Sequence, residues 1–274
     1  MVNMMKSHMV KAREALTESE IMRVAPSVFA ESAHESRGPR YQYIPTIDVL
    51  RGLMKEGFQP YAVTQSRTRI EGKQGHTKHM LRLRHADFIQ TVGETVSEVI
   101  LLNSHDGTSS YHMTAGCFRF VCSNGMVVAD SLLESVKVRH SGKVQAEVIQ
   151  GAFRVMDAFA AIDESRDSMQ HLQLSDGEQR AFAGAALALR YGTEEIPPIS
   201  AEQVNTARRW DDRGDSLWTT FQRAQENLVQ GGLRSSNRER RTTTRAVNGI
   251  DGNVALNRGL WVLAEEMRKL RAAA

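Results

Sequence analysis

The pattern of hydrophobic and polar positions changes twice along the chain. Up to about residue 57 the apolar residues recur at helical spacing, which predicts one helix over 11–23, ended by Pro26. A second, short helix is expected from Thr46, a residue suited to capping, to Gly57, which stands where a C-terminal cap belongs. Beyond Gly57 the alternation becomes that of strands, and from about residue 141 helical spacing returns.

The middle segment reads as a series of β-hairpins. The stretches PYAVTQSRTRI and KHMLRLRHA flank the turn-rich EGKQGHT, and TVSEVILLN and SSYHMTAGCFRFVC flank a second turn. A further tight turn is expected at Ser123-Asn124-Gly125, because Asn-Gly readily adopts the positive φ values that such turns need. Short strands with turn-length connections predict an antiparallel sheet over about residues 60–130.

The last part of the chain carries helix-boundary signals. Ser175 and Glu178 have the spacing of a capping box, and Gly192 is expected to end the same helix. Ser200 and Gln203 have the spacing of a second capping box. The predicted fold class is therefore α+β: an antiparallel sheet flanked by N-terminal helices and followed by a mostly helical C-terminal half. We expect one domain over 1–274, with 1–140 and 141–274 as the alternative division.

Composition also indicates the cellular compartment in which the protein is expected. Hydrophobic residues make up 41% and charged residues 24%, which are ordinary globular values. No apolar run approaches the roughly 18 residues that a membrane span needs, and the N-terminus lacks the apolar core of a signal peptide. The two cysteines, Cys117 and Cys122, are too few for a disulfide framework. A cytoplasmic protein without a membrane partner is expected.

Charge is concentrated in two basic segments, although the net charge of the chain is only +3. Six Lys or Arg against one Glu give 60–86 a charge of +5, and five Arg against one Glu give 232–246 a charge of +4. The second segment, GGLRSSNRERRTTTR, is typical of a flexible linker or arm. Concentrated positive charge favours an anionic partner such as nucleic acid.

Side-chain alternation on the first hairpin predicts one basic face, which is expected to lie in solvent and to follow a phosphodiester backbone. The competing interpretation is that surface strands carry Lys and Arg to prevent edge-to-edge pairing. For the arm, the competing interpretation is a solvated linker. The candidate nucleic-acid-binding residues are Arg67, Arg69, Lys78, Arg82 and Arg84 of the hairpin and Arg234, Arg238, Arg240, Arg241 and Arg245 of the arm.

Few residues offer base stacking or catalysis. The obvious stacking candidates are Tyr61, Tyr111, Phe118 and Phe120, most of them expected in the core. Neither a phosphate-cradling glycine loop nor a GxSxG nucleophile turn occurs, so no catalytic residue, cofactor or metal is assigned. Two alternatives stay open at this point: a metal held by His76, His79 or His85, and a nuclease carboxylate pair of Asp87 and Glu98.

Several stretches together resemble one known family. YQYIPTIDVLRGLMKEGFQP, QSRTR, KHMLRLRH and TAGCFRFVCSNGMVV are similar to an uncharacterised family carried by prophages, plasmids and other mobile elements of bacteria. The resemblance implies a role in recombination, replication or evasion of host defence, and it supplies no site residues. A basic hairpin flanked by helices is also similar in outline to single-strand annealing proteins, which bind phosphates in a basic groove and assemble into rings.

These observations lead to one functional expectation with two alternatives. We expect a non-enzymatic protein that binds nucleic acid, single-stranded DNA in particular, in recombination or repair by a mobile element, with a homo-oligomer as the form that the annealing analogy suggests. The first alternative is a protein-binding antagonist of a host defence system. The second is a metal-dependent nuclease.

Overall fold

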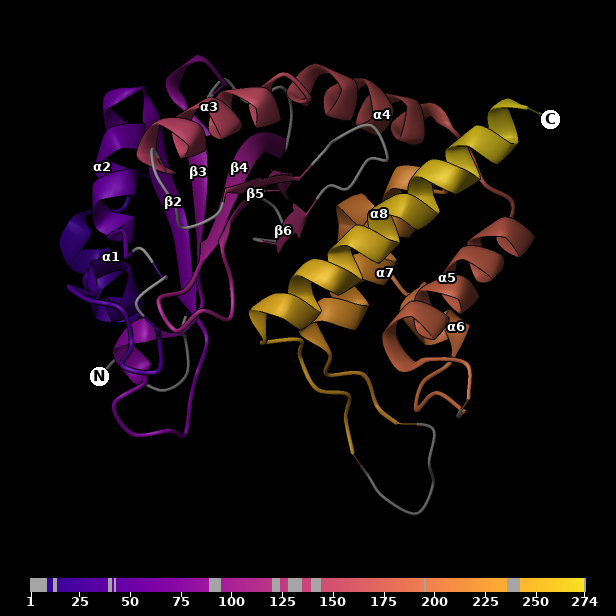
Figure 1. Ribbon diagram of the computed structural model, residues 1–274. Coiled ribbons are helices and arrows are strands. Elements are labelled where there is room, and N and C mark those ends of the chain that lie inside the picture. The colour runs from indigo at the N-terminus through magenta and orange to yellow at the C-terminus, as the bar shows by residue number, and fades with distance from the viewer. Residues whose placement is uncertain are drawn as a thin grey trace. The chain divides into compact units, whose positions relative to one another are not determined.

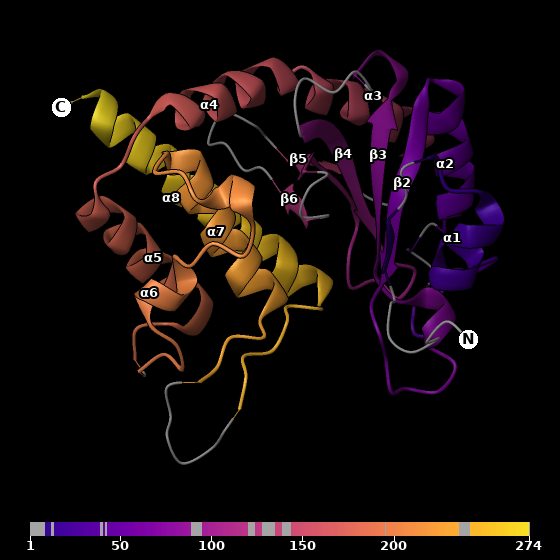
Figure 2. The ribbon, with the colours of Figure 1, turned by 180° about the vertical axis from the view of Figure 1, so that it is seen from behind.

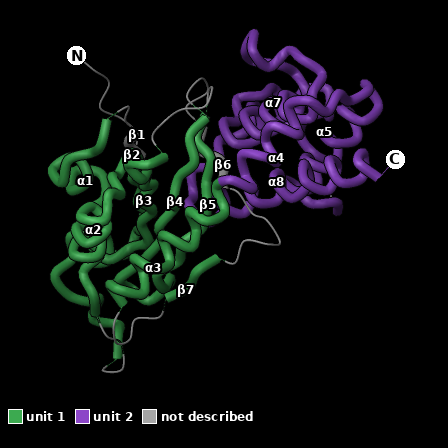
Figure 3. The backbone as a smooth tube through the Cα atoms, turned by 90° about the horizontal axis from the view of Figure 1, so that it is seen from above, with its two compact units in different colours: residues 1–126, 131–159 green, residues 127–130, 160–274 purple. Residues whose placement is uncertain are grey.

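The computed structural model describes residues 9–11, 14–38, 41, 43–88, 95–119, 124–127, 135–138, 144–194, 196–235 and 242–273. The chain divides into two compact units, coloured separately in Figure 3. Unit 1 comprises Met1–Met126 and Ser131–Phe159, and unit 2 comprises Val127–Asp130 and Ala160–Ala274. The helical C-terminal half and the sheet-bearing N-terminal half confirm the expected α+β class.

Unit 1 is built on an antiparallel sheet with strand order β1-β2-β3-β4-β5-β6, in which β7 also pairs with β5. Consecutive strands are neighbours, as the predicted series of hairpins requires. The strands are β1 (Met9–Lys11), β2 (Phe58–Gln65), β3 (His79–His85), β4 (Thr95–Asn103), β5 (Tyr111–Arg119), β6 (Asn124–Val127) and β7 (Val136–Val138).

Helices cover one face of this sheet (Figures 1 and 2). The covering elements are α1 (Glu18–Val24), the 3₁₀ turn η1 (Pro26–Phe29), α2 (Thr46–Lys55) and α3 (Val144–Met156). The first helix is shorter than the predicted 11–23, because Thr17 and Glu20 form a capping box that starts it at Glu18. The residues before it include β1, which pairs with β2.

A β-bulge in β2 decides which side chains face these helices. The pairing of β2 with β3 runs from Phe58 opposite His85 to Gln65 opposite His79, and the register shifts between Pro60 and Ala62. The extra residue lets Phe58 and Gln65, seven positions apart, face the same side of the sheet. Phe58 packs edge-on against His85, and Gln65 reaches η1.

A chain of buried polar side chains joins η1, β3, α2 and the turn after β4. Ser27 Oγ lies 2.9 Å from His79 Nδ1, and His79 Nε2 lies 3.0 Å from Thr46 Oγ1. Thr46 Oγ1 lies 3.0 Å from His105 Nε2 and accepts a hydrogen bond from Asn103 Nδ2 at 2.9 Å. All five residues are fully buried. Thr46 is thus the first residue of α2 and uses its hydroxyl in the core, whereas Pro45 occupies the cap position.

Hydrogen-bond matching assigns the protons along this chain. The Ser27 hydroxyl donates to Gln65 Oε1 at 2.9 Å, so it accepts from His79 Nδ1–H. His79 Nε2 then accepts from the Thr46 hydroxyl. Burial lowers the pKa of His79 from 6.5 to about 4, so the ring is neutral at physiological pH.

The opposite face of the sheet holds a buried ion triad, which corrects the prediction of a solvent-exposed basic face. Arg82 and Arg84 are only 3% and 4% exposed, and Glu98 of β4 between them is 1% exposed. Arg84 Nε donates to Glu98 Oε1 at 2.9 Å, and Arg82 Nε donates to Glu98 Oε2. The sequence correctly predicts that Arg82 and Arg84 share one face of β3. The register pairs Leu83 with Val99, and this pairing places Glu98 of β4 on the same face, beside both arginines. The guanidinium of Arg84 also lies 4.1 Å from the ring centroid of Tyr61.

Unit 2 is helical. Its elements are α4 (Phe159–His171), whose first residue belongs to unit 1, α5 (Asp176–Tyr191), α6 (Ala201–Val204), the 3₁₀ turn η4 (Trp210–Asp212), α7 (Leu217–Gln230) and α8 (Ile250–Ala272). The capping boxes predicted at Ser175 and Ser200 are both present, and Gly192 ends α5 with a φ of 80°. Among the described helices, none combines the length and apolar character needed to cross a membrane.

The basic arm between α7 and α8 has an ordered base, so the prediction of a flexible linker is wrong for its described part. Gly232 N donates to Thr244 O at 2.8 Å, Thr244 N donates to Leu233 O at 2.8 Å, and Arg234 forms a β-bridge with Thr243. Gly231 has a φ of 64°, and a Cβ there would lie 2.6 Å from the Arg245 carbonyl carbon. The base is therefore a two-stranded hairpin that packs closely against the end of α7.

Protonation of His79 is expected to destabilise the fold as the pH falls. The folded-state pKa lies below that of the unfolded chain, so the unfolded state takes up more protons, and stability present above pH 6.5 is lost between pH 6.5 and about 4. The free energy of unfolding should decrease by about 3 kcal/mol across this window. Urea denaturation at several pH values measures it. His79→Asn should remove this part of the dependence of the unfolding free energy on pH. The control variant His34→Asn, at a half-buried histidine, should keep it. The same pH dependence in His79→Asn and in wild type would contradict the assignment.

Removing the carboxylate of the ion triad is expected to be strongly destabilising. Glu98→Gln leaves two buried guanidinium groups without their shared negative charge, which costs about 3–5 kcal/mol of unfolding free energy. Chemical denaturation measures the loss, and Glu71→Gln in the exposed part of the basic segment serves as the charge-matched control with near-wild-type stability. A loss below about 1 kcal/mol would show that the triad is not a structural element.

Candidate nucleic-acid interface

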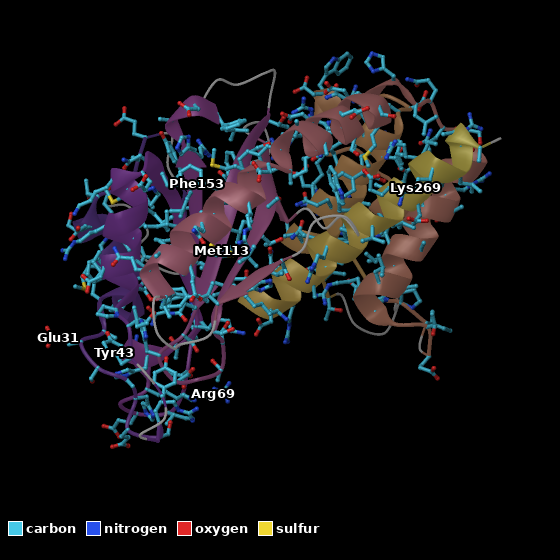
Figure 4. The ribbon with its side chains drawn as sticks, turned by 45° about the horizontal axis from the view of Figure 1, so that its top comes forward. Glu31, Tyr43, Arg69, Met113, Phe153 and Lys269 are labelled. Atoms are coloured by element: carbon cyan, nitrogen blue, oxygen red, sulfur yellow. The ribbon has the colours of Figure 1, made fainter. Side chains whose placement is uncertain are left out.

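The exposed cations of the first basic segment lie on the loop 66–78 that connects β2 to β3. The strands end at Gln65 and begin again at His79, so Arg67, Arg69 and Lys78 lie on a loop. This corrects the prediction that they stand on paired strands. Arg67 and Arg69 are exposed and Lys78 is half-buried. Figure 4 labels Arg69 at the end of unit 1 opposite to Phe153 of α3.

Two features reduce the charge that the segment presents to solvent. Arg82 and Arg84 are in the buried triad and are not available to a phosphate backbone. Lys73 of the loop forms an ion pair with Asp106, with Nζ 3.2 Å from Oδ2. Of the hairpin cations chosen from the sequence, Arg67, Arg69 and Lys78 remain as surface candidates.

The arm contributes exposed arginines on unit 2. Arg234 and Arg245 are exposed and flank its hairpin base, and Gln203 Nε2 donates to Arg234 O at 2.9 Å. The candidates Arg238, Arg240 and Arg241 lie outside the described residues. The ordered base fixes the direction in which the described arginines leave the unit.

A polar pocket of about 460 Å³ lies between the end of α1 and the basic loop. The side chains and backbone that line it come from Arg23, Val24, Pro26, Gln65, Ser66, Arg67, Thr68 and Gln74. Arg23 and Arg67 are exposed, and neither forms an ion pair within the described part of the chain. The pocket thus brings together two arginine residues 44 positions apart in sequence.

Gln65 links the pocket to the buried polar chain. Its Oε1 accepts from both the backbone N–H of Ser27 at 3.0 Å and the Ser27 hydroxyl at 2.9 Å. Its Nε2 donates to Gln74 O at 2.6 Å. Because the backbone N–H of Ser27 can only donate, the amide oxygen must face Ser27 and the amide nitrogen must face the pocket side.

The two catalytic alternatives receive no support from the geometry. His79 and His85 stand six residues apart on β3, about 20 Å at 3.3 Å per residue, so one ion cannot bind both. Glu98 is occupied by two arginines, whereas Asp87 is exposed beside His85. No group of three or more His, Cys, Asp or Glu side chains in the described ranges is arranged to hold a metal. Cys117 is buried on β5, and Cys122 lies outside those ranges.

The aromatic residues chosen for base stacking are inaccessible where they are described. Tyr61, Tyr111 and Phe118 are buried, and Phe120 lies outside the described residues. The exposed aromatic residue that the sequence reading missed is Trp210 of unit 2, which is 76% exposed and carries the Arg213 guanidinium 4.4 Å from its ring centroid. Its position between Arg208-Arg209 and Asp211-Asp212 is the only local signal that marked it as a surface residue.

Sequence reading also missed the pocket residues Arg23 and Gln65. Arg23 stands in the last turn of α1, where a basic residue is ordinary, and Gln65 ends a strand. Neither carries a local signal of function, because the pocket forms only when α1 packs beside the β2–β3 loop.

Comparison with known proteins places the chain among uncharacterised relatives. Two curated proteins of Escherichia coli (strain K12), UPF0380 protein YafZ and UPF0380 protein YfjQ, are each 51% identical to it over 262 residues, covering 95% of this chain and 94% of the relative. No solved structure matches. The model of a domain of unknown function, DUF932, matches residues 33–261, so the match spans most of both units. The chain belongs to the DUF932 family.

Proposed function

We propose that the protein binds nucleic acid, single strands in particular, through the loop 66–78 and the neighbouring Arg23, with the arginines of the arm assisting. The observation that carries the proposal is the presence of Arg23 and Arg67 on one pocket, with neither in an ion pair among the described residues, although the charge of Arg23 also acts on the carboxylate of Glu20 in the same helix. Arg69 extends the same exposed loop. Unneutralised guanidinium groups on a surface loop attract phosphates without reading sequence.

The proposal places binding at the loop end of the sheet and not along its face. Arg82 and Arg84 act as structural residues of unit 1, because their charges are already matched to Glu98 in the interior. A loop that projects beyond paired strands can follow a flexible single strand, whose phosphates adapt their spacing to the cations. Use in recombination or repair by a mobile element is the biological role that we infer for such binding.

Replacing two loop arginines is expected to weaken the binding of single strands and to lower its salt dependence. Each phosphate contact contributes about −0.7 to the slope of log K against log salt, so Arg67→Gln/Arg69→Gln should make the slope less steep by about 1.4. At about 50 mM salt this corresponds to roughly a tenfold loss of affinity for each contact. Fluorescence anisotropy of a labelled oligothymidine, with duplex DNA as competitor, measures both quantities.

A charge-matched control lies at the other end of unit 1. Lys55 of α2 and Arg154 of α3 are exposed, and Lys55→Gln/Arg154→Gln removes the same charge away from the loop. This variant should retain nearly the wild-type slope. Equal losses in both double variants would assign the binding to net charge alone, and no binding by the wild type at low salt would reject the proposal in favour of a protein partner.

A further inference from the structure

We propose that the pocket lined by Arg23, Gln65 and Arg67 is a discrete binding site for one phosphate group. The inference rests on the proposed function only for the molecule that carries the phosphate. The argument that the pocket binds a phosphate group depends on its own side chains. The side chains of the pocket offer hydrogen-bond donors, and two of its backbone carbonyls, Ser66 O and Gln74 O, already accept hydrogen bonds from the protein.

The donors come from three elements of unit 1. The guanidinium groups of Arg23 and Arg67 stand at the end of α1 and on the loop. Thr68 Oγ1 accepts from Ile70 N at 3.1 Å, which leaves the hydroxyl hydrogen of Thr68 to donate. Gln65 Nε2 uses one hydrogen for Gln74 O, and its second hydrogen is left for a ligand.

Two carbonyl groups at the pocket, those of Ser66 and Gln74, accept hydrogen bonds within the protein. The Thr77 hydroxyl donates to Ser66 O at 2.9 Å and approaches Gln74 O at 3.3 Å. Gln74 O also accepts from Gln65 Nε2. With these acceptors satisfied by the protein, a cation or a neutral donor finds few partners, whereas a tetrahedral oxyanion finds several charge-assisted ones.

The buried polar chain makes Gln65 a positioning residue of this site. Reversing its amide would set Nε2 against the backbone N–H of Ser27, two donors facing one another, so the chain from Thr46 through His79 and Ser27 holds one orientation. Gln65 is only 7% exposed, so its donor is fixed before a ligand arrives. Donors that need no reorganisation bind an anion more tightly than mobile surface side chains do.

The geometry defines a phosphate group but not the molecule that carries it. An internal phosphodiester, a terminal phosphate of a strand and free inorganic phosphate share the same oxygens. Isothermal titration calorimetry on the full chain with inorganic phosphate, pyrophosphate and an oligothymidine with or without a 5′-phosphate separates these sources, because a terminal-phosphate site prefers the phosphorylated strand.

The variants pair a pocket arginine with a loop arginine that does not line the pocket. Arg67→Gln should weaken phosphate or pyrophosphate binding about tenfold, the effect of one charge-assisted hydrogen bond, while Arg69→Gln, with the same charge change in the same loop, should stay within about twofold of wild type. Ser27→Ala leaves the charge unchanged and removes one of the two hydrogen bonds that Gln65 Oε1 accepts, while the backbone N–H of Ser27 keeps the other. It should therefore weaken pyrophosphate binding by only about two- to threefold while circular dichroism stays native.

The outcomes distinguish the pocket from the broader function. Oligonucleotide binding that Arg67→Gln and Arg69→Gln weaken equally would overturn the pocket and leave the proposed function intact. Pyrophosphate binding lost in Arg67→Gln alone, with no oligonucleotide binding, would support the pocket and overturn the proposed function. Absence of binding by every phosphate probe would overturn the inference.

Discussion

The neutral ring of His79 is the constraint on which much of unit 1 depends. Its Nε2 accepts a hydrogen bond from the Thr46 hydroxyl and its Nδ1–H donates one to Ser27, so a single tautomer connects the start of α2, the middle of the sheet and the turn η1 that follows α1. Burying this many polar side chains is tolerable because each of the five residues forms at least one hydrogen bond within the chain. The helices therefore dock on the sheet at one depth and in one orientation, which apolar packing alone would specify less sharply.

The two faces of the sheet bury different kinds of polar side chain. The helix-covered face uses neutral donors and acceptors, whereas the other face shares one carboxylate between two guanidinium groups. The ring of Tyr61 also lies against the Arg84 guanidinium, a cation–π contact that adds to the ion pairs of the triad. Of the cations in the first basic segment, those of the loop remain at the surface, so the proposed interface is smaller and more localised than the charge of the segment suggests.

Local signals in the sequence identified most elements of the fold, although α1 is shorter and the first hairpin has a longer loop than predicted. Hydrophobic alternation identified the hairpins, and the serines that cap α5 and α6 were visible from their spacing. Local signals could not reveal what lies opposite a side chain. Arg82 and Arg84 alternate with leucines as they would on a half-exposed strand, and only the β3–β4 register shows that Glu98 stands beside them. The pocket likewise depends on Arg23 and Arg67 meeting through tertiary packing, which no spacing rule encodes.

The bulge in β2 has a consequence for how this chain tolerates changes of length. Phe58 and Gln65 face the same side only because one additional residue lies between Pro60 and Ala62. Deleting a single residue there would restore regular pairing but rotate one end of the strand by half a turn, taking either the aromatic contact of Phe58 or the amide of Gln65 out of the interior. Insertions and deletions among relatives should therefore accumulate in the loop 66–78, while the length of the segment from Gly57 to Gln65 stays constant.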